Sequence, residues 1–144
     1  MHEITILEML GDLYRRTLKA VAPLAVAEGL SMTEMLVVWK MHRGECRQVK
    51  ELLADVGLSP STLTGVLDRL TAGGWLTREA DPEDRRAVVM RRTEKLDAFL
   101  HTLEKERTRT LEAAFRRLPK DLMRRLGEDL RAVLECLGNE EENP

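Results

Sequence analysis

The sequence predicts a mainly helical protein with one small β-hairpin. Apolar residues recur at helical spacing along most of its 144 residues. The exception is a stretch in which two strand-like segments, WLTREA and RAVVMRR, flank a turn from Asp81 to Asp84. With 43% hydrophobic and 33% charged residues, the composition is that of one unit able to bury a core.

Two helices are expected first. One runs from Ile4 to about Val21, and Pro23 is expected to interrupt it, because proline lacks the N–H that a helix interior needs. The next begins at Ser31, which has the spacing of a capping box with Glu34.

Two short amphipathic helices joined by a tight turn follow. Apolar residues repeat at i, i+3, i+4 and i+7 in each: Val49, Leu52, Leu53 and Val56 in the first, and Leu63, Val66, Leu67 and Leu70 in the second. Gly57 fits the left-handed end of the first helix, and Ser59 with Pro60 fits the start of the second. The pattern is typical of a helix-turn-helix, although any helical hairpin has the same periodicity.

The hairpin that comes next favours the helix-turn-helix interpretation. Helix, turn, helix and hairpin is the order of a winged helix, in which the second helix enters the major groove of DNA and the hairpin tip reaches the minor groove. Residues 85–92 contain four arginines and no acid, within a chain of net charge −2. We therefore expect Arg85 and Arg86, at the tip, to contact DNA.

The second short helix is the expected recognition helix. If its apolar side faces the core, hydroxyl residues and one arginine face outward, and the candidate DNA contacts are Ser59, Ser61, Thr62, Thr64 and Arg69. Asp68 on the same side would repel phosphate. We expect it to pair with Arg69, Arg78 or a wing arginine and so to help order the wing.

The final helix, after Pro119, carries an apolar stripe at near-heptad spacing that needs a partner helix. A partner within the protomer is one possibility. Because the first helix has a similar stripe, and two copies would supply the half-sites of a palindromic operator, we expect an intertwined homodimer. The candidate dimerisation residues are Leu7, Leu122, Leu126, Leu130 and Leu137.

Residues 58–95, LSPSTLTGVLDRLTAGGWLTREADPEDRRAVVMRRTEK, resemble the MarR (multiple-antibiotic-resistance regulator) family of bacterial transcription factors. The resemblance implies a dimeric winged-helix regulator whose N- and C-terminal helices form the dimer interface. It also implies that Arg86 is the wing arginine that contacts DNA, that Asp84 orders the wing, and that Arg69 is a basic residue of the recognition helix. Where many members have arginine after the threonine of that helix, this chain has Gly65.

The resemblance further implies a small lipophilic or phenolic effector, bound between the dimer helices and the winged helix. The candidate pocket residues are Tyr14, Trp39 and His42, although Trp39 also fits a plain core position. Some members sense oxidants through a cysteine of the first helix. No cysteine precedes Cys46, so that mechanism has no residue to carry it.

Motifs of other functional classes are missing. The sequence has no phosphate-binding glycine loop, no G-x-S-x-G and no histidine pair at metal-ligand spacing, so neither an enzyme nor a metal or other cofactor is expected. No apolar run reaches the ~18 residues of a membrane span, and the N-terminus lacks a signal-peptide pattern, which favours a cytoplasmic protein.

We expect an N-terminal dimerisation helix in residues 1–30, a winged helix-turn-helix DNA-binding region in 31–93 and C-terminal dimerisation helices in 94–144. The expected function is a DNA-binding transcriptional regulator, a homodimeric repressor of a palindromic operator that a small molecule releases. The alternative is a winged-helix adaptor that binds proteins and not DNA. Gly65 and the acids at the wing base favour the adaptor, and the arginine cluster opposes it.

Overall fold

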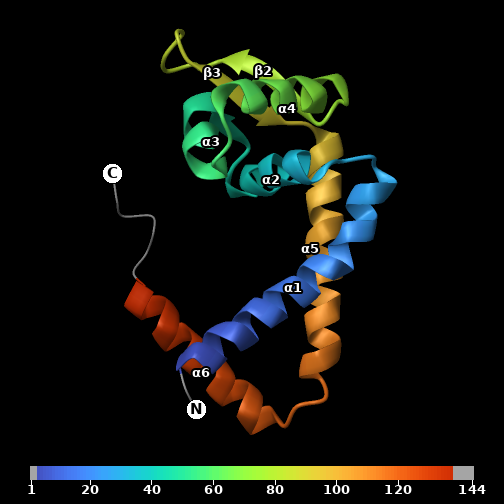
Figure 1. The fold of residues 1–144 in the computed structure, drawn as a ribbon, viewed down its shortest axis with the longest axis vertical. Helices are drawn as coiled ribbons and strands as arrows, with labels where there is room; N and C mark the ends of the chain where they lie inside the picture. The colour runs from blue at the N-terminus through green and yellow to red at the C-terminus, as the bar shows by residue number, and fades with distance from the viewer. Residues whose placement is uncertain (1–2, 138–144) are drawn as a thin grey trace. The chain divides into compact units, whose positions relative to one another are not determined.

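The computed structural model describes residues 3–137 of a chain that divides into two units, residues 1–107 and 108–144. The first unit contains α1 (Glu3–Ala27), α2 (Met32–Lys40), the 3-10 helix η1 (Met41–Arg43), β1 (Cys46–Gln48), α3 (Val49–Val56), α4 (Pro60–Ala72), β2 (Leu76–Ala80) and β3 (Val88–Arg92). Helix α5 (Glu94–Phe115) begins in the first unit and ends in the second, which also contains α6 (Lys120–Leu137). The predicted fold class, mainly helical with a small hairpin, is confirmed (Figure 1).

Helix α1 continues through Pro23, where the sequence predicts an interruption. Pro23 lies on the exposed side of the helix, while Val21 and Ala25 are buried in the core. Packing of that buried side offsets the hydrogen bond that proline cannot make. The helix ends instead at Ala27. Gly29, just beyond it, has a φ of +70° and forms a left-handed cap in which the Leu30 N–H donates to the Ala25 carbonyl at 3.0 Å.

No single helix within residues 3–137 is both long and apolar enough to cross a bilayer. The segments Thr5–Ala27 and Met32–Arg43 reach that length and hydropathy only together, and the chain bends by 110° between them.

The predicted caps of the helix-turn-helix are confirmed. The Glu34 N–H donates to Ser31 Oγ at 3.2 Å and the Ser31 N–H donates to Glu34 Oε2 at 2.7 Å, which completes the capping box of α2. Gly57 ends α3 with a φ of +69°, and Ser59 Oγ accepts the Thr62 N–H at 3.2 Å at the start of α4. Gly57 and the Ser59 cap thus mark where the turn between α3 and α4 begins and ends.

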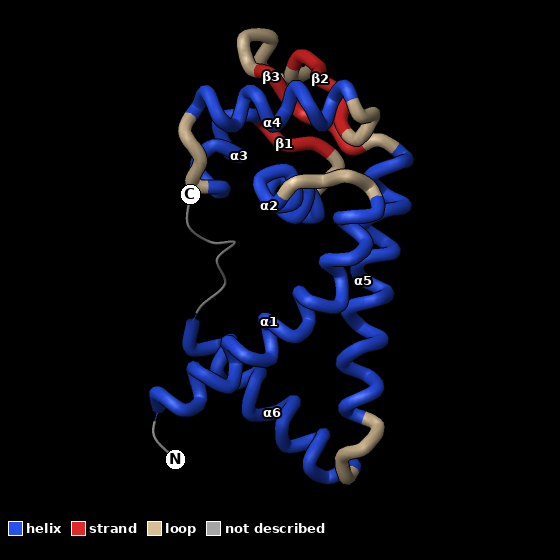
Figure 2. The backbone as a smooth tube through the Cα atoms, turned by 45° about the vertical axis from the view of Figure 1, so that its right-hand side comes forward, coloured by secondary structure: helices blue, strands red, loops and turns tan. Residues whose placement is uncertain are grey.

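The core of the first unit is built around the apolar side of α4. Leu63, Val66, Leu67 and Leu70 are each at most 1% exposed, and they pack with Leu52 of α3, Met90 of β3 and Leu96 of α5. Burial of one such side chain contributes about 1.5–3 kcal/mol. Figure 2 shows α2, α3 and α4 grouped with the three strands at the start of α5.

The strands form one antiparallel sheet in the order β1-β3-β2. The predicted hairpin is confirmed, with β2 and β3 paired from Leu76 opposite Arg92 to Ala80 opposite Val88. Strand β1 was not predicted, because three residues carry too short a pattern to be recognised. It exists through its pairing with β3, where Gln48 lies opposite Val89.

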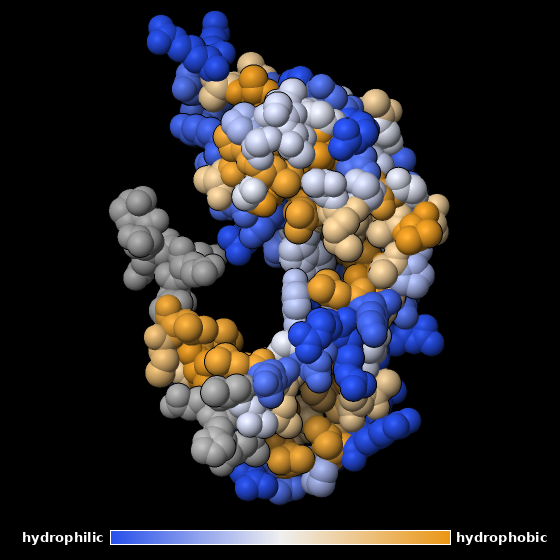
Figure 3. Space-filling view, viewed as in Figure 1, coloured by the Kyte–Doolittle hydropathy of each residue, from blue (hydrophilic) through white to orange (hydrophobic). Residues whose placement is uncertain are grey.

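Helix α6 has no buried side chain among its described residues. Its apolar stripe is exposed, with Leu122 at 39%, Leu130 at 40% and Leu137 at 75%, and it forms an orange run along this helix in Figure 3. Leu7 of α1 is also exposed. The predicted dimerisation residues, with Leu126 partly covered, therefore lie on surface that is available to a partner.

The positive φ of Gly57 predicts a stability difference between two glycine substitutions. Gly57→Ala should lower the free energy of unfolding by about 1–2 kcal/mol, because an L side chain is strained in the left-handed region. Gly127→Ala, in the interior of α6 where an added Cβ meets nothing within 4 Å, should raise it by about 0.5–1 kcal/mol. Urea unfolding of both variants measures the difference. Equal effects of the two substitutions would contradict the assigned turn.

Candidate nucleic-acid interface

The N-terminal turn of α4 exposes a group of hydroxyls. Ser59 Oγ lies 2.7 Å from Thr62 Oγ1 and 3.3 Å from Ser61 Oγ, and all three residues are exposed. The Thr64 hydroxyl donates to the Pro60 carbonyl at 2.9 Å, so its proton is engaged within the helix. Exposed hydroxyls at a helix start suit contact with a phosphate group.

The hairpin tip is ordered by backbone bonds to acidic side chains. Asp84 Oδ1 accepts the Arg86 N–H at 3.0 Å, and the Asp84 carbonyl accepts the Ala87 N–H at 2.9 Å. Arg85 and Arg86 are exposed, and the tip forms the hydrophilic projection at the top of Figure 3. The tip therefore presents two guanidinium groups on a short turn.

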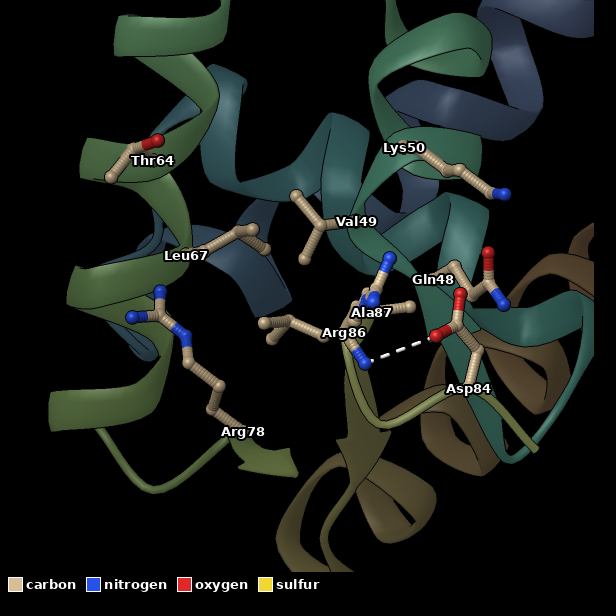
Figure 4. Close-up of a pocket in the computed structure, with 10 residues that line it drawn as sticks. Gln48, Val49, Lys50, Thr64, Leu67, Arg78, Asp84, Arg86 and Ala87 are labelled. Atoms are coloured by element: carbon tan, nitrogen blue, oxygen red, sulfur yellow. Dashed lines mark hydrogen bonds between the residues drawn. The ribbon is translucent and has the colours of Figure 1, made fainter. Parts of the chain in front are cut away.

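A hollow of about 500 Å³ separates the wing from α3 and α4. Figure 4 shows Arg86 between the two helices, with Thr64 and Arg78 on one side and Lys50 on the other. The lining residues are Gln48, Val49, Lys50, Thr64, Leu67, Arg78, Asp84, Arg86, Ala87 and Val88. Lys50 of α3 and Arg78 of β2 were not among the predicted DNA contacts, because the sequence does not show that their side chains line the same hollow as Arg86.

Two acidic residues hold arginines beside the recognition helix. Arg78 Nη2 donates to Asp68 Oδ1 at 2.9 Å, which is one of the three pairings expected for Asp68. Arg69 Nε donates to Glu34 Oε1 at 3.3 Å, so Arg69 reaches back to α2. Hydrogen bonds from Ser31 and Arg69 hold the pKa of Glu34 below its usual value.

The Arg69 side chain passes beside Gly65. A Cβ built at Gly65 would lie 3.5 Å from Arg69 Nη1, so the guanidinium passes close to the glycine. The pairing with Glu34 places Arg69 at the contact between α2 and α4. Among the predicted DNA contacts, Arg69 is thus the one that the structure engages in an ion pair within the protein.

Asp81 anchors the base of the wing, a role that the sequence did not indicate. Its side chain is buried, Oδ1 accepts the Glu83 N–H at 2.9 Å, and Oδ2 accepts the Gln48 amide at 2.5 Å. Its own N–H donates to the Ala87 carbonyl at 3.0 Å. The dipeptide Asp81-Pro82 indicated only a turn, whereas the bond to Gln48 connects residues 33 positions apart.

The candidate pocket residues are only partly brought together. The rings of Trp39 and His42 lie 5.3 Å apart, and the Arg107 guanidinium lies 4.7 Å from the centre of the Trp39 ring. Trp39 is half-buried, and Tyr14 lies exposed on α1. Neither the hollow at the wing nor a second hollow of about 330 Å³ between α1, Trp75 and α5 is lined by these three residues.

The described residues offer no group of three His, Cys, Asp or Glu side chains that could hold a metal ion. Cys46 and Cys136 are both exposed free thiols.

The helix-turn-helix, the three-stranded sheet and the arginine tip define a winged helix-turn-helix protein. Residues 30–88 match the model of the MarR family. The Bacillus subtilis (strain 168) protein YfiV, named as an HTH-type transcriptional regulator, is 28% identical over 110 residues, which are 76% of this chain and 69% of YfiV.

Solved structures show the same fold. The transcriptional regulator Tm0710 from Thermotoga maritima superposes with a TM-score of 0.80 at 21% identity, covering 99% of this chain and 100% of the other. Bordetella bronchiseptica BpsR, whose DNA binding is regulated by 6-hydroxynicotinic acid, superposes with a TM-score of 0.58 at 19% identity, covering 90% and 98%.

The bonds of Asp81 predict a pH-dependent contribution to stability. The Glu83 N–H and then the Gln48 amide hold the pKa of Asp81 below its usual value, so the ionised form stabilises the folded protein. This stabilisation is present above the unfolded pKa of about 3.9 and is lost as the pH falls through the lower folded value. Asp81→Asn should therefore lower the thermal midpoint at neutral pH, and its difference from the parent should shrink in acid. Thermal scans over that range measure this, and a difference that does not change with pH would exclude the role.

Proposed function

We propose that this chain is a DNA-binding transcriptional regulator that acts in the cytoplasm as a homodimeric repressor of a palindromic operator. The observation that carries the proposal is the arrangement of Lys50, Arg86 and the Asp68-paired Arg78 around one hollow with Thr64 of α4, next to the exposed Arg85 at the wing tip. In a chain of net charge −2, these groups create the local positive surface that DNA phosphates require.

The geometry favours DNA over the adaptor alternative. The acids that favoured an adaptor are Asp81, Glu83 and Asp84. The side chains of Asp81 and Asp84 accept backbone N–H groups of the wing. Arg85 and Arg86 remain exposed at its tip. An arginine pair on a projecting turn suits the negative potential of a narrow minor groove.

We infer that direct base readout by α4 is modest. Ser61, Thr62 and Thr64 present short side chains, Gly65 presents none, and Arg69 is paired with Glu34. Affinity therefore depends mainly on the wing and on the presence of two copies of the site in a dimer. The proposed DNA contacts are Ser59, Ser61, Thr62, Thr64, Arg69, Arg85 and Arg86, joined by Lys50 and Arg78.

A small aromatic effector is the proposed ligand that releases the operator. The regulation of BpsR by 6-hydroxynicotinic acid supports this chemical class. In this chain, the neighbouring Trp39 and His42 rings, tilted by 37° to each other, form with the Arg107 guanidinium a surface suited to a planar anion. Tyr14 stays a candidate contact.

The wing assignment is tested by Arg86→Ala. Loss of one charged contact in each protomer should weaken operator binding and reduce the slope of log affinity against log salt by about 2 per dimer. The fold should be unchanged, because Arg86 is exposed on a turn. Fluorescence anisotropy with an operator selected from random DNA at several salt concentrations measures both quantities.

The matched control for the wing is Arg116→Ala, which removes an exposed arginine in the turn after α5 that pairs with Glu112 of that helix. It should retain the affinity and salt slope of the parent. If Arg86→Ala and Arg116→Ala bind equally well, the wing does not contact DNA.

The dimer is tested by Leu130→Glu. A carboxylate in the α6 stripe would be buried against an apolar partner surface, so the variant should sediment as a monomer and lose operator binding at concentrations where the parent is dimeric. Ala132→Glu, on the opposite side of α6 at ~100° per residue, is the control and should remain dimeric. A Leu130→Glu protein that is less stable but still dimeric would place the partner of the stripe within one protomer.

A further inference from the structure

The residues that follow the recognition helix are bonded to the start of α5. Lys95 Nζ donates to the Gly73 carbonyl at 2.8 Å, and Thr93 Oγ1 donates to the Gly74 carbonyl at 2.7 Å. The Thr93 N–H donates to the Trp75 carbonyl at 3.3 Å. Thr93 and Lys95 thus bond to the three successive carbonyls of Gly73, Gly74 and Trp75. We call these five residues the helix junction.

The Trp75 ring closes the helix junction. It is 4% exposed, and its centre lies 5.2 Å from that of the Phe99 ring on α5. The Lys95 ammonium lies 4.0 Å from the centre of the same indole ring. A Cβ at Gly73 would lie 2.9 Å from Trp75 Cδ1, so glycine is what allows the ring to approach the end of α4.

The Lys95 ammonium thus contacts both the Gly73 carbonyl at the end of α4 and the Trp75 ring. The carbonyls at the C-terminal end of a helix carry partial negative charge, and a cation there is favourable. A cation over an indole face is also attractive. Both attractions draw the end of α4 toward the first turn of α5, which continues unbroken to Phe115.

We propose that Lys95 is a positioning residue that sets the angle between α4 and α5, and with it the spacing of the two half-sites that the dimer accepts. The inference rests on the proposed function, because it concerns how two recognition helices meet one operator. In a dimer joined through the terminal helices, α5 is the direct link from each α4 toward the partner. Half-site spacing follows from the geometry of that link.

The experiment compares operators that differ only in spacing. An operator selected with the parent protein is also made with its centre one base pair shorter and one base pair longer, and anisotropy at constant salt gives the three affinities. Lys95→Met keeps a long apolar side chain and removes the charge and the donors. For Lys95→Met, the ratio of affinity for the selected operator to affinity for the altered operators should fall by about fivefold or more. This is the size of the effect of a single specificity contact.

Two variants control for a merely structural effect. Lys105→Met removes another exposed lysine of α5 and should keep the spacing preference of the parent, while Lys95→Arg keeps charge and donors and should restore most of it. Light scattering and circular dichroism should show a folded dimer for every variant.

The possible outcomes separate this inference from the proposed function. An unchanged preference in Lys95→Met, or an equal loss of affinity for all three operators, would overturn the positioning role. A parent protein that selects no DNA at all would overturn the proposed function itself.

Discussion

Burial of one side of α4 is the constraint on which the interface depends. Leu63, Leu67 and Leu70 are at most 1% exposed, so the helix cannot turn about its axis without moving apolar side chains into water. A shift by one residue would rotate the surface by ~100° and replace the hydroxyls with leucine. The surface of α4 that a ligand can contact is therefore the side that is not buried in the core. In this chain that surface is short and polar, with a glycine in its middle.

The acids and the arginines of the wing have different roles. Asp81 and Asp84 bond to backbone N–H groups and to Gln48, which shapes the turn and connects it to β1. The acids thus act on the backbone of the wing, and the guanidinium groups of Arg85 and Arg86 are exposed at its tip. The wing contains nearly equal numbers of acids and arginines, but Arg85 and Arg86 lie together at its exposed tip.

The parts of the fold that depend on local bonds were predictable from the sequence. Capping by Ser31 and Ser59, the turn at Gly57 and the periodicity of α4 involve residues a few positions apart. The continuation of α1 through Pro23 and the strand β1 depend on tertiary packing, which overrides local preference. At the site, Arg85 and Arg86 followed from the hairpin pattern. The bonds of Gln48 to Asp81 and of Glu34 to Arg69 span 33 and 35 residues, and no pattern along the chain reveals them.

The uncovered α6 has a consequence for how much of the protein a cell must make. A helix with no buried side chain among its described residues gains little from its own chain, so its stability comes from whatever covers the stripe. If a second copy covers it, the population of complete molecules rises with the square of chain concentration at low abundance. Occupancy of a target would then respond steeply to synthesis and dilution during growth. Through the apolar stripe of α6, the number of copies of the protein in the cell would then itself affect regulation.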